Sequence, residues 1–229
     1  MKNIAIIPAR CGSKGLKDKN IKELNGKPLL AYSVDTAVDS GLFDEVMVST
    51  DSNEYAGIAR KCGASVPFLR SNEQSGDDAD SWGVVLEVLA KYMENGQYFD
   101  TVCLLQPTSP LRKTEDILAA YELMHDKNAD AVTSVCEVDH SPLWTMMLDE
   151  DQSLFEFRKN LVNVPRQKLS KYFRLNGAIY IKRICYGENI TLLDEKEYAV
   201  IMDQRNSVDI DTIEDFELAE WYLNSKRRE

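Results

Sequence analysis

Short apolar runs alternate with helical patterns of apolar residues through the first 135 residues of the chain. A run of about four to eight apolar residues is typical of a buried strand, whereas apolar residues spaced three and four apart indicate one face of a helix. Their alternation favours βαβ units, and therefore a mainly parallel sheet with helices on both faces. We expect strands over residues 3–8, 45–49, 65–69, 101–105 and 131–135, and helices around 30–38, 53–61, 82–89 and 117–124.

Proline and glycine mark the ends of these elements. Pro28 precedes the first helical pattern and Gly41 follows it, which is the usual asymmetry of helix termini. Gly63 closes the second helical pattern in the same way. Pro67 has no N–H for a sheet hydrogen bond, so we expect residues 65–69 to lie at the edge of the sheet.

The regular alternation stops after Val138. Residues 140–171 show no helical period but hold large apolar side chains, including Trp144 and Phe155. Strand patterns return at 178–181 and 198–202, and a closing helix is expected over 213–223. A segment that leaves the sheet and returns to it suits a dimerisation arm, and a long surface loop is the alternative. We expect one doubly wound α/β domain over 1–229, with 139–175 as a dimerisation excursion.

Composition changes this interpretation little, but charge adds to it. The chain has 229 residues, of which 44% are hydrophobic, and a formal net charge of −11. That charge argues against a nucleic-acid partner, because binding to the phosphate backbone depends on clustered cations. Residues 10–22 nevertheless hold five basic side chains against one acidic one. Such a loop can focus a small anion, and the alternative is a solvated turn that carries lysines.

The five cysteines are scattered without CxxC spacing, and His125 and His140 are the two histidines. Neither a disulfide framework nor a zinc or histidine-rich metal centre follows from them. The apolar run before Arg10 is too short for a signal peptide or a membrane span. We therefore expect a reduced, cytoplasmic protein with no membrane partner.

The loop after the first predicted strand has the composition of an anion site. In open α/β sheets, ligands bind beyond the carboxyl ends of the strands, where this loop is expected to lie. Gly12 and Gly15 allow a close backbone approach, and Arg10 and Lys14 add positive charge. The loop contains neither a Walker A sequence nor GxGxxG. On its own it indicates a phosphate or carboxylate site, with a plain turn as the alternative.

Asp209 and Asp211 form a second candidate site. Residues i and i+2 of an extended segment point the same way, so both carboxylates can face one cation such as Mg²⁺. The alternative is that Asp211 caps a helix beginning near Thr212 while Asp209 is solvated.

Several stretches together have the order and spacing of a known family. They are residues 8–20 (PARCGSKGLKDKN), 48–51 (VSTD), 105–112 (LQPTSPLR), 165–167 (PRQ), 174–180 (RLNGAIY) and 209–212 (DIDT). The chain resembles the N-acylneuraminate cytidylyltransferases (CMP-sialic acid synthetases) across its whole length. The resemblance implies a Rossmann-like α/β fold, a homodimer, and Mg²⁺-dependent transfer of CMP from CTP to the anomeric hydroxyl of N-acetylneuraminic acid with release of pyrophosphate.

The resemblance also implies roles for individual residues. Arg10, Lys14 and Lys19 would bind the triphosphate of CTP. Gly12, Ser13 and Asn20 would contact the same nucleotide. Arg70 and Ser81 would hold the cytosine. Gln106, Arg174, Asn176 and Tyr180 would line the sugar pocket, where Arg166 from the partner subunit would bind the sugar carboxylate. Asp209 and Asp211 would hold the metal, and Lys19, Arg10 and Asp211 would take part in catalysis.

Two departures bear on the sugar. Trp144 stands where bacterial members have a lysine on the partner arm, although a lone tryptophan also suits the core of a dimer. Residues 192–193 replace an aromatic pair beside the acyl group. Both changes favour a related nonulosonic acid (legionaminic or pseudaminic acid), whereas Gln106 favours neuraminic acid. A cytidylyltransferase for the eight-carbon 3-deoxy-octulosonic acid fits the first loop less well.

A non-catalytic nucleotide-binding module is the alternative of another class, and the retained Lys14, Lys19, Asp209 and Asp211 argue against it. Cys11 adds a separate question: a cationic loop can lower the pKa of a thiol, and an inert small residue is the alternative.

Overall fold

The computed structural model describes residues 1–12, 15–76, 80–148, 150–161 and 168–225. The main strands are β1 (Asn3–Pro8), β4 (Glu45–Ser49), β5 (Thr101–Leu104), β6 (Ala131–Glu137), β7 (Phe173–Tyr186), β8 (Ile190–Leu193) and β9 (Glu197–Met202). The helices are α1 (Leu29–Ser40), α2 (Asn53–Lys61), α3 (Ser81–Glu94), α4 (Thr114–Asp126), α5 (Phe155–Asn160) and α6 (Ile213–Ser225). A two-stranded ribbon, β2 (Glu23–Leu24) and β3 (Lys27–Pro28), follows a 3₁₀ turn, η1 (Lys19–Ile21).

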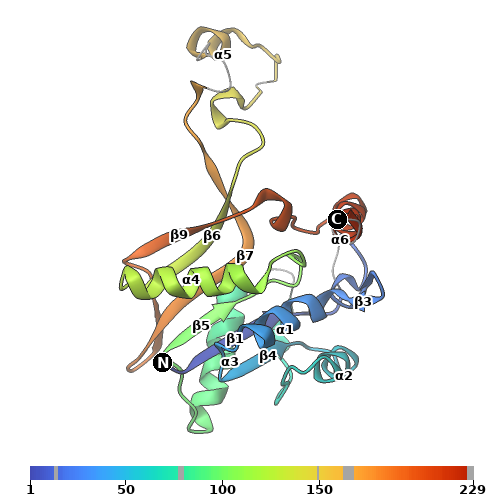
Figure 1. Cartoon of the computed structure of the whole chain (residues 1–229), viewed down its shortest axis with the longest axis vertical. Helices are drawn as coiled ribbons and strands as arrows, with labels where there is room; N and C mark the ends of the chain where they lie inside the picture. Colours follow the sequence, from blue (N-terminus) through green and yellow to red (C-terminus); the bar gives the residue numbers. More distant parts are fainter. Residues whose placement is uncertain (13–14, 77–79, 149, 162–167, 226–229) are drawn as a thin grey trace.

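The seven main strands form one sheet in the order β4-β1-β5-β7-β6-β9, and β8 pairs with β7. β1 runs parallel to β4 and β5, and β6 runs parallel to β9. β7 is antiparallel to β5, β6 and β8, so it is the one strand of this sheet that opposes the common direction. The doubly wound, mainly parallel sheet is confirmed (Figure 1).

Alternate side chains of the first strand serve the two faces of the sheet. Ala5 and Ile7 belong to a core shared with α1, α2 and α4. Ile4 and Ile6 belong to a second core, which α3 covers. Because both faces are buried, the strand reads as a continuous apolar run rather than as an alternating one. Burial of these four residues is complete, which explains why the pattern predicted the strand correctly.

Three elements differ from the sequence prediction. Residues 65–69 do not form a strand: Ser65 makes an isolated bridge to Met47 at the sheet edge, and Pro67 cannot extend the pairing. β7 is 14 residues long, because its ends carry exposed and polar side chains that the apolar run at 178–181 does not include. β8 is a short, partly exposed strand of four residues that the sequence prediction did not include.

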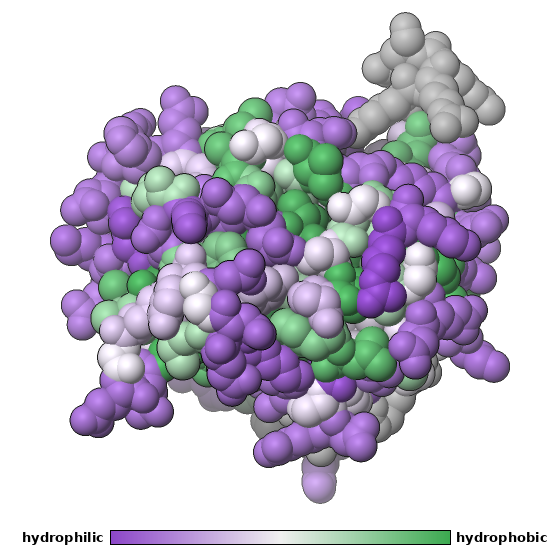
Figure 2. Space-filling view, turned by 90° about the horizontal axis from the view of Figure 1, so that it is seen from below, coloured by the Kyte–Doolittle hydropathy of each residue, from purple (hydrophilic) through white to green (hydrophobic). Residues whose placement is uncertain are grey.

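Between β6 and β7 the chain leaves the sheet as a projecting extension (Figure 1). Its described part contains η3 (Pro142–Trp144) and α5, and β7 already begins at Phe173, within the 139–175 span. Met147 and Phe155 are 96% and 71% exposed there. Figure 2 shows the end of the molecule opposite this extension, where hydrophilic residues surround smaller hydrophobic patches. Within the described residues, no helix has both the length and the apolar character needed to span a bilayer.

Candidate functional site

The loop after β1 is fastened to its surroundings by polar contacts. Gly12 has a φ of +73°, in the left-handed region that favours glycine. The side-chain Nδ2 of Asn20 donates to the Arg10 carbonyl at 3.0 Å. Asp51, directly after β4, accepts from the Cys11 backbone N at 2.9 Å and from the Cys11 Sγ at 3.2 Å. The sequence analysis missed Asp51 as an individual site residue, although its position after a buried strand was a usable signal.

Contact with Asp51 also decides the state of Cys11. The hydrogen bond to this carboxylate, together with burial and the negative charge of Asp51, raises the pKa of the Cys11 thiol. A carboxylate neighbour favours the neutral thiol over the thiolate. The structure therefore favours the inert interpretation of Cys11 over a reactive thiolate.

Lys19 connects this loop to the second candidate site at the far end of the chain. Its Nζ donates to the Ile210 carbonyl at 2.6 Å and to Asp211 Oδ1 at 2.9 Å. Only 12% of the Lys19 side chain is exposed, compared with 77% for Asp211. Gly15 lies against the same segment, because a Cβ on it would stand 2.8 Å from the Asp211 carbonyl oxygen. Gly15 therefore permits the approach of two protein segments, in addition to any approach to a ligand.

The N-terminus of α6 is capped without Asp211. The Thr212 Oγ1 accepts from the Asp215 backbone N at 3.3 Å, and the Asp215 carboxylate accepts from the Thr212 backbone N at 2.9 Å. This reciprocal pair is a capping box. The alternative in which Asp211 caps the helix is therefore wrong, and its carboxylate faces Lys19 instead.

Asp209 lies in a more enclosed environment than Asp211. Burial raises the pKa of its carboxyl, against a lowering by the hydrogen bond from Thr108, and the charge of Asp211 adds to the increase. Its Oδ1 is buried and has no hydrogen-bond partner among the described residues. A buried carboxylate oxygen without a donor is costly unless a cation or a proton satisfies it.

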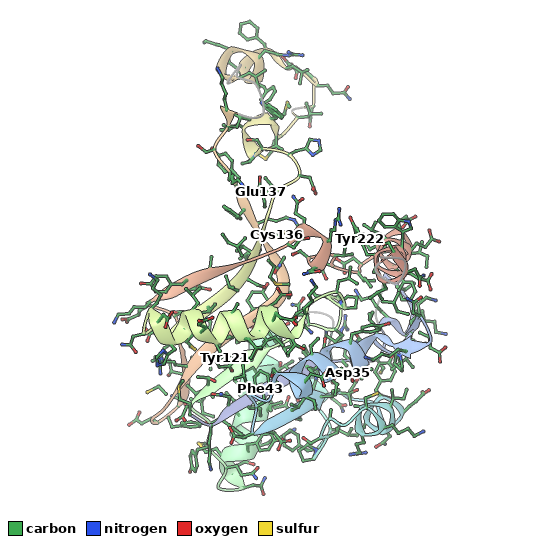
Figure 3. All side chains as sticks on the ribbon, viewed as in Figure 1. Asp35, Phe43, Tyr121, Cys136, Glu137 and Tyr222 are labelled. Atoms are coloured by element: carbon green, nitrogen blue, oxygen red, sulfur yellow. The ribbon has the colours of Figure 1, made fainter. Side chains whose placement is uncertain are left out.

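Two cavities meet at Asp211. The first has a volume of about 480 Å³ and lies beyond the carboxyl ends of β1 and β5. Its lining includes Arg10, Gly15, Lys19, Asn20, Arg70, Ser81, Gln106 and Asp211. The second, of about 560 Å³, is lined by residues that include Arg174, Arg205, Asp209 and Asp211. It lies between the base of the extension, where Glu137 is labelled, and α6, which carries Tyr222 (Figure 3).

Arg70 and Ser81 also line the first cavity. The Arg70 guanidinium donates to the Ser49 carbonyl at 2.7 Å through Nη2, and to the Ser49 Oγ at 3.2 Å through Nε. Burial lowers the pKa of Arg70. Ser81 is the first residue of α3, as expected, whereas Arg70 follows an extended segment rather than a strand.

The four described residues expected around the sugar are not brought to one surface. Gln106 lines the first cavity and Arg174 the second. Asn176 is 1% exposed, and its side-chain amide bonds to Ser134, Ala178 and Ser207, so it faces the interior. Tyr180 is half-buried, and its ring packs edge-on against Trp82 at 6.2 Å. Ser13, Lys14 and Arg166 lie outside the described residues. All the ligand roles stay predictions.

The fold and the cavities define the class: an α/β protein that can hold an anionic ligand beyond the carboxyl ends of parallel strands. A sequence model of the cytidylyltransferase family matches residues 4–224. The chain belongs to this family.

Relatives within this family carry several substrate names. A CMP-N,N'-diacetyllegionaminic acid synthase of Legionella pneumophila is 38% identical over 96% of this chain and 95% of its own length. An N-acylneuraminate cytidylyltransferase of Streptococcus agalactiae is also 38% identical, over 94% of this chain but 52% of its own length. A pseudaminic acid cytidylyltransferase of Campylobacter jejuni is 35% identical over 96% of this chain and 95% of its own length.

A solved structure supports the fold. The structure of CMP:2-keto-3-deoxy-manno-octonic acid synthetase complexed with CTP matches with a TM-score of 0.70. The match covers 99% of this chain and 100% of that chain, at 17% identity. At this identity the likeness concerns the fold, which is Rossmann-like.

Proposed function

We propose that this cytidylyltransferase transfers CMP from CTP to the anomeric hydroxyl of N-acetylneuraminic acid and releases pyrophosphate. The observation that carries the proposal is the position of Asp211. Asp211 lines both cavities and its carboxylate contacts Lys19, so a nucleotide in the first cavity and a sugar acid in the second would meet beside this residue. The family membership and the names of the relatives support the same chemistry.

The first cavity suits CTP in both charge and shape. Arg10 and Lys19 would bind the triphosphate, next to Gly12, Ser13, Lys14 and Asn20 of the same loop. Arg70 and Ser81, which line the same cavity, would hold the cytosine. Buried Arg70 keeps a fixed position through its bonds to Ser49, and that suits recognition of a planar base edge.

The residues at the junction of the cavities fit a magnesium ion. The unpartnered Oδ1 of Asp209 is a buried anionic oxygen, and the exposed Asp211 carboxylate lies two residues away in sequence. Mg²⁺ prefers such hard oxygen ligands and is commonly held by one or two carboxylates together with phosphate oxygens. Asp209 and Asp211 would hold the ion, and it would neutralise charge on the phosphates.

Phosphoryl transfer requires from the protein mainly positioning and positive charge. The anomeric hydroxyl oxygen attacks the α-phosphorus, and the bond from that phosphorus to the pyrophosphate oxygen breaks. Lys19 and Arg10 would stabilise the negative charge that grows on the departing pyrophosphate. Asp211 is the acceptor that we propose for the hydroxyl proton, because this residue lines both cavities and its side chain is exposed.

A legionaminic-type acid is the second candidate substrate. The Legionella relative covers the chain end to end, and Trp144 and residues 192–193 depart from the sialic acid pattern. Leu192 and Tyr180, an expected sugar residue, both pack against the core that α3 covers. Gln106 at the first cavity favours N-acetylneuraminic acid.

Pyrophosphate release tests both the reaction and the sugar. The chain would be incubated with CTP and Mg²⁺ and, separately, with N-acetylneuraminic, N,N'-diacetyllegionaminic and pseudaminic acids. We expect the highest kcat/KM with N-acetylneuraminic acid, and a higher value with another acid would reassign the substrate. The absence of pyrophosphate release with every acid, despite measurable CTP binding, would favour a non-catalytic nucleotide-binding module.

We also propose a homodimer, in which the extension donates Arg166 to the partner's sugar pocket. Phe173 and Leu175 on β7, and Ile201 on β9, are exposed apolar residues at the base of the extension, and both strands pair with β6 there. Apolar residues gathered in this way are typical of an interface. Sedimentation should give a dimer, and Ile201→Asp should give monomers with reduced transfer.

We propose a cytoplasmic location. All five cysteines belong to the described residues, and none of them is in a disulfide. Unpaired cysteines are typical of proteins from reducing compartments. Cell fractionation with an antibody to the chain tests this assignment.

A further inference from the structure

Arg112 lies beneath the junction of the two cavities and does not line either of them. It is 3% exposed, and it follows the loop from β5 that carries Gln106. Its Nη1 donates to the Ala178 carbonyl at 2.6 Å and, more weakly, to the Gln106 carbonyl at 3.4 Å. Its Nη2 donates to the Ser33 Oγ. One guanidinium therefore connects α1, the β5 loop and β7.

Ser33 completes a closed arrangement with these two residues. Its hydroxyl accepts from Arg112 and donates to the Gln106 carbonyl at 3.2 Å. Ser33 is fully buried, so this arrangement is sheltered from water. The Gln106 main chain is thus fixed by two side chains from different elements, and both depend on the position of the guanidinium.

A buried guanidinium of this kind is costly. Burial lowers the pKa of Arg112 to about 10, and its Nε has no hydrogen-bond partner among the described residues. Within the residues that the structure describes, no carboxylate oxygen lies within ion-pair distance of the Arg112 guanidinium. An apolar side chain would serve simple packing at lower cost. The planar fork of a guanidinium can hold acceptors on several elements in fixed directions at once. A flexible or an apolar side chain cannot do this, which explains the arginine.

The space between the two segments that Arg112 holds is narrow. A Cβ on Gly177 would stand 3.2 Å from the Gln106 Oε1 and 3.5 Å from the Asp209 Oδ2. Gly177 directly precedes Ala178, whose carbonyl Arg112 binds, and it has a φ of +75°. The separation of β7 from the Gln106 loop therefore sets where the Gln106 amide and the Asp209 carboxylate can lie.

We propose that Arg112 is a positioning residue for the sugar-acid half of the reaction, acting through Gln106. It fixes the distance between the Gln106 loop and β7 at Gly177, and thereby the orientation of the Gln106 side chain at the junction of the cavities. The inference rests on the proposed cytidylyl transfer to a sugar acid. It predicts that Arg112 affects the use of the sugar acid and leaves CTP binding unchanged. Gln106 lines the first cavity, but its side-chain Oε1 lies against Gly177, close to where Asp209 of the second cavity lies. None of the Arg112 contacts reaches Arg70, Lys19 or Asn20.

The test is a double-mutant cycle of Arg112→Lys with Gln106→Ala. Lysine keeps the charge but cannot hold Ala178 and Ser33 together as a fork does. Arg112→Lys should lower kcat/KM for the sugar acid by about tenfold with the Kd for CTP unchanged, and should cause little further loss when Gln106 is already alanine. Equal losses in both backgrounds, or a parallel loss of CTP affinity, would overturn the proposal.

Two further variants make the result of the double-mutant cycle interpretable. Arg183→Lys is the matched control, because the Arg183 guanidinium, like that of Arg112, donates to a backbone carbonyl, through Nε to that of Ala129 at 2.8 Å. It should change the melting temperature and leave the kinetics of sugar use unchanged. If Arg112→Lys does not fold, Ser33→Ala replaces it in the same cycle, with the same non-additivity expected.

If the proposed function itself is wrong, the wild-type protein gives a result that differs from failure of the Arg112 proposal. Wild-type protein that forms no product with any sugar acid would refute cytidylyl transfer, whatever the variants do. A crystal structure of Arg112→Lys then decides the positioning role. Displacement of the Gln106 side chain from Gly177 supports it, and an unchanged Gln106 overturns it.

Discussion

The Lys19 ammonium lies 2.9 Å from the Asp211 carboxylate, which is 192 residues further along the chain. The same ammonium donates to the Ile210 carbonyl at 2.6 Å, so Lys19 binds the main chain of this segment as well as its carboxylate. The contact joins the cationic loop to the acidic pair, and Asp211 in turn lines both cavities. A phosphate bound at Lys19 and a cation bound at Asp211 would therefore be neighbours.

Lys19→Ala should lower kcat by about 10²–10³-fold, as expected for loss of a fixed cation that faces developing charge. The far-ultraviolet circular dichroism should stay unchanged, because this ammonium takes no part in the backbone hydrogen bonds of the main strands and helices. Steady-state pyrophosphate release measures the effect. Lys17→Ala is the control, since it removes the same charge from an exposed position in the same loop. Near-normal turnover of Lys19→Ala would remove Lys19 from the mechanism.

Asp211→Asn should raise the Mg²⁺ concentration needed for half-maximal activity, because it removes a ligand charge and the partner of Lys19. Titration of activity with Mg²⁺ measures the change. Thr212→Ala is the control at the adjacent residue. It loses the capping box of α6 and about 1 kcal/mol of stability, and it should leave the metal titration unchanged. If Thr212→Ala shifts the titration as much as Asp211→Asn does, the effect of Asp211 is structural.

Asp209 should make the stability of the metal-free protein depend on pH. Burial raises the pKa of its carboxyl in the folded state, so the folded protein binds this proton more readily than the unfolded chain. The contribution to stability is fully present below the unfolded pKa and is lost as the pH rises through the folded pKa. Asp209→Asn should therefore melt higher than wild type near neutral pH in EDTA, with a difference that shrinks in acid.

Thermal melts of wild type and Asp209→Asn across this pH range measure the difference. Asp39→Asn, at an exposed position on α1, is the control and should show no such trend. Added Mg²⁺ should stabilise wild type more than Asp209→Asn, because ligand binding to the folded state raises its stability. A constant difference between the two proteins at every pH would contradict a raised pKa for the Asp209 carboxyl.

Gly15→Ala should weaken CTP binding by about tenfold, or about 1.4 kcal/mol. The new methyl group would meet the Asp211 carbonyl oxygen at 2.8 Å, so the lysine loop and the Asp211 segment must separate. Calorimetric titration with CTP measures the loss. Gly57→Ala is the control, because a Cβ there meets nothing within 4 Å and alanine favours the helix α2. Unchanged affinity in Gly15→Ala would show that the two segments can move apart freely.

The sequence alone determined the order of the elements and the chemical character of the first loop. Residues 3–8, 45–49 and 53–61 were predicted with the ends that the structure shows, because the apolar run of a buried strand and the apolar face of a helix are strong local patterns. The positive charge of the loop and the pairing of Asp209 with Asp211 are also local properties. They indicated an anion and a cation without locating either one.

The tertiary structure decided which of these residues meet. Thr212 caps helix α6, and the neighbouring Asp211 pairs with Lys19. Local propensity does not distinguish which of these two adjacent residues caps the helix. In the tertiary structure the Asn176 side chain lies in the interior, and β7 runs opposite to the other strands of its sheet. The ends of β7 carry polar residues, so its full length was not predicted from the apolar pattern. The tertiary structure also brought Arg112 beneath Gln106 and Ala178. The physical reason is that apolar periodicity reports burial one element at a time, whereas contacts between distant segments depend on how the finished elements pack.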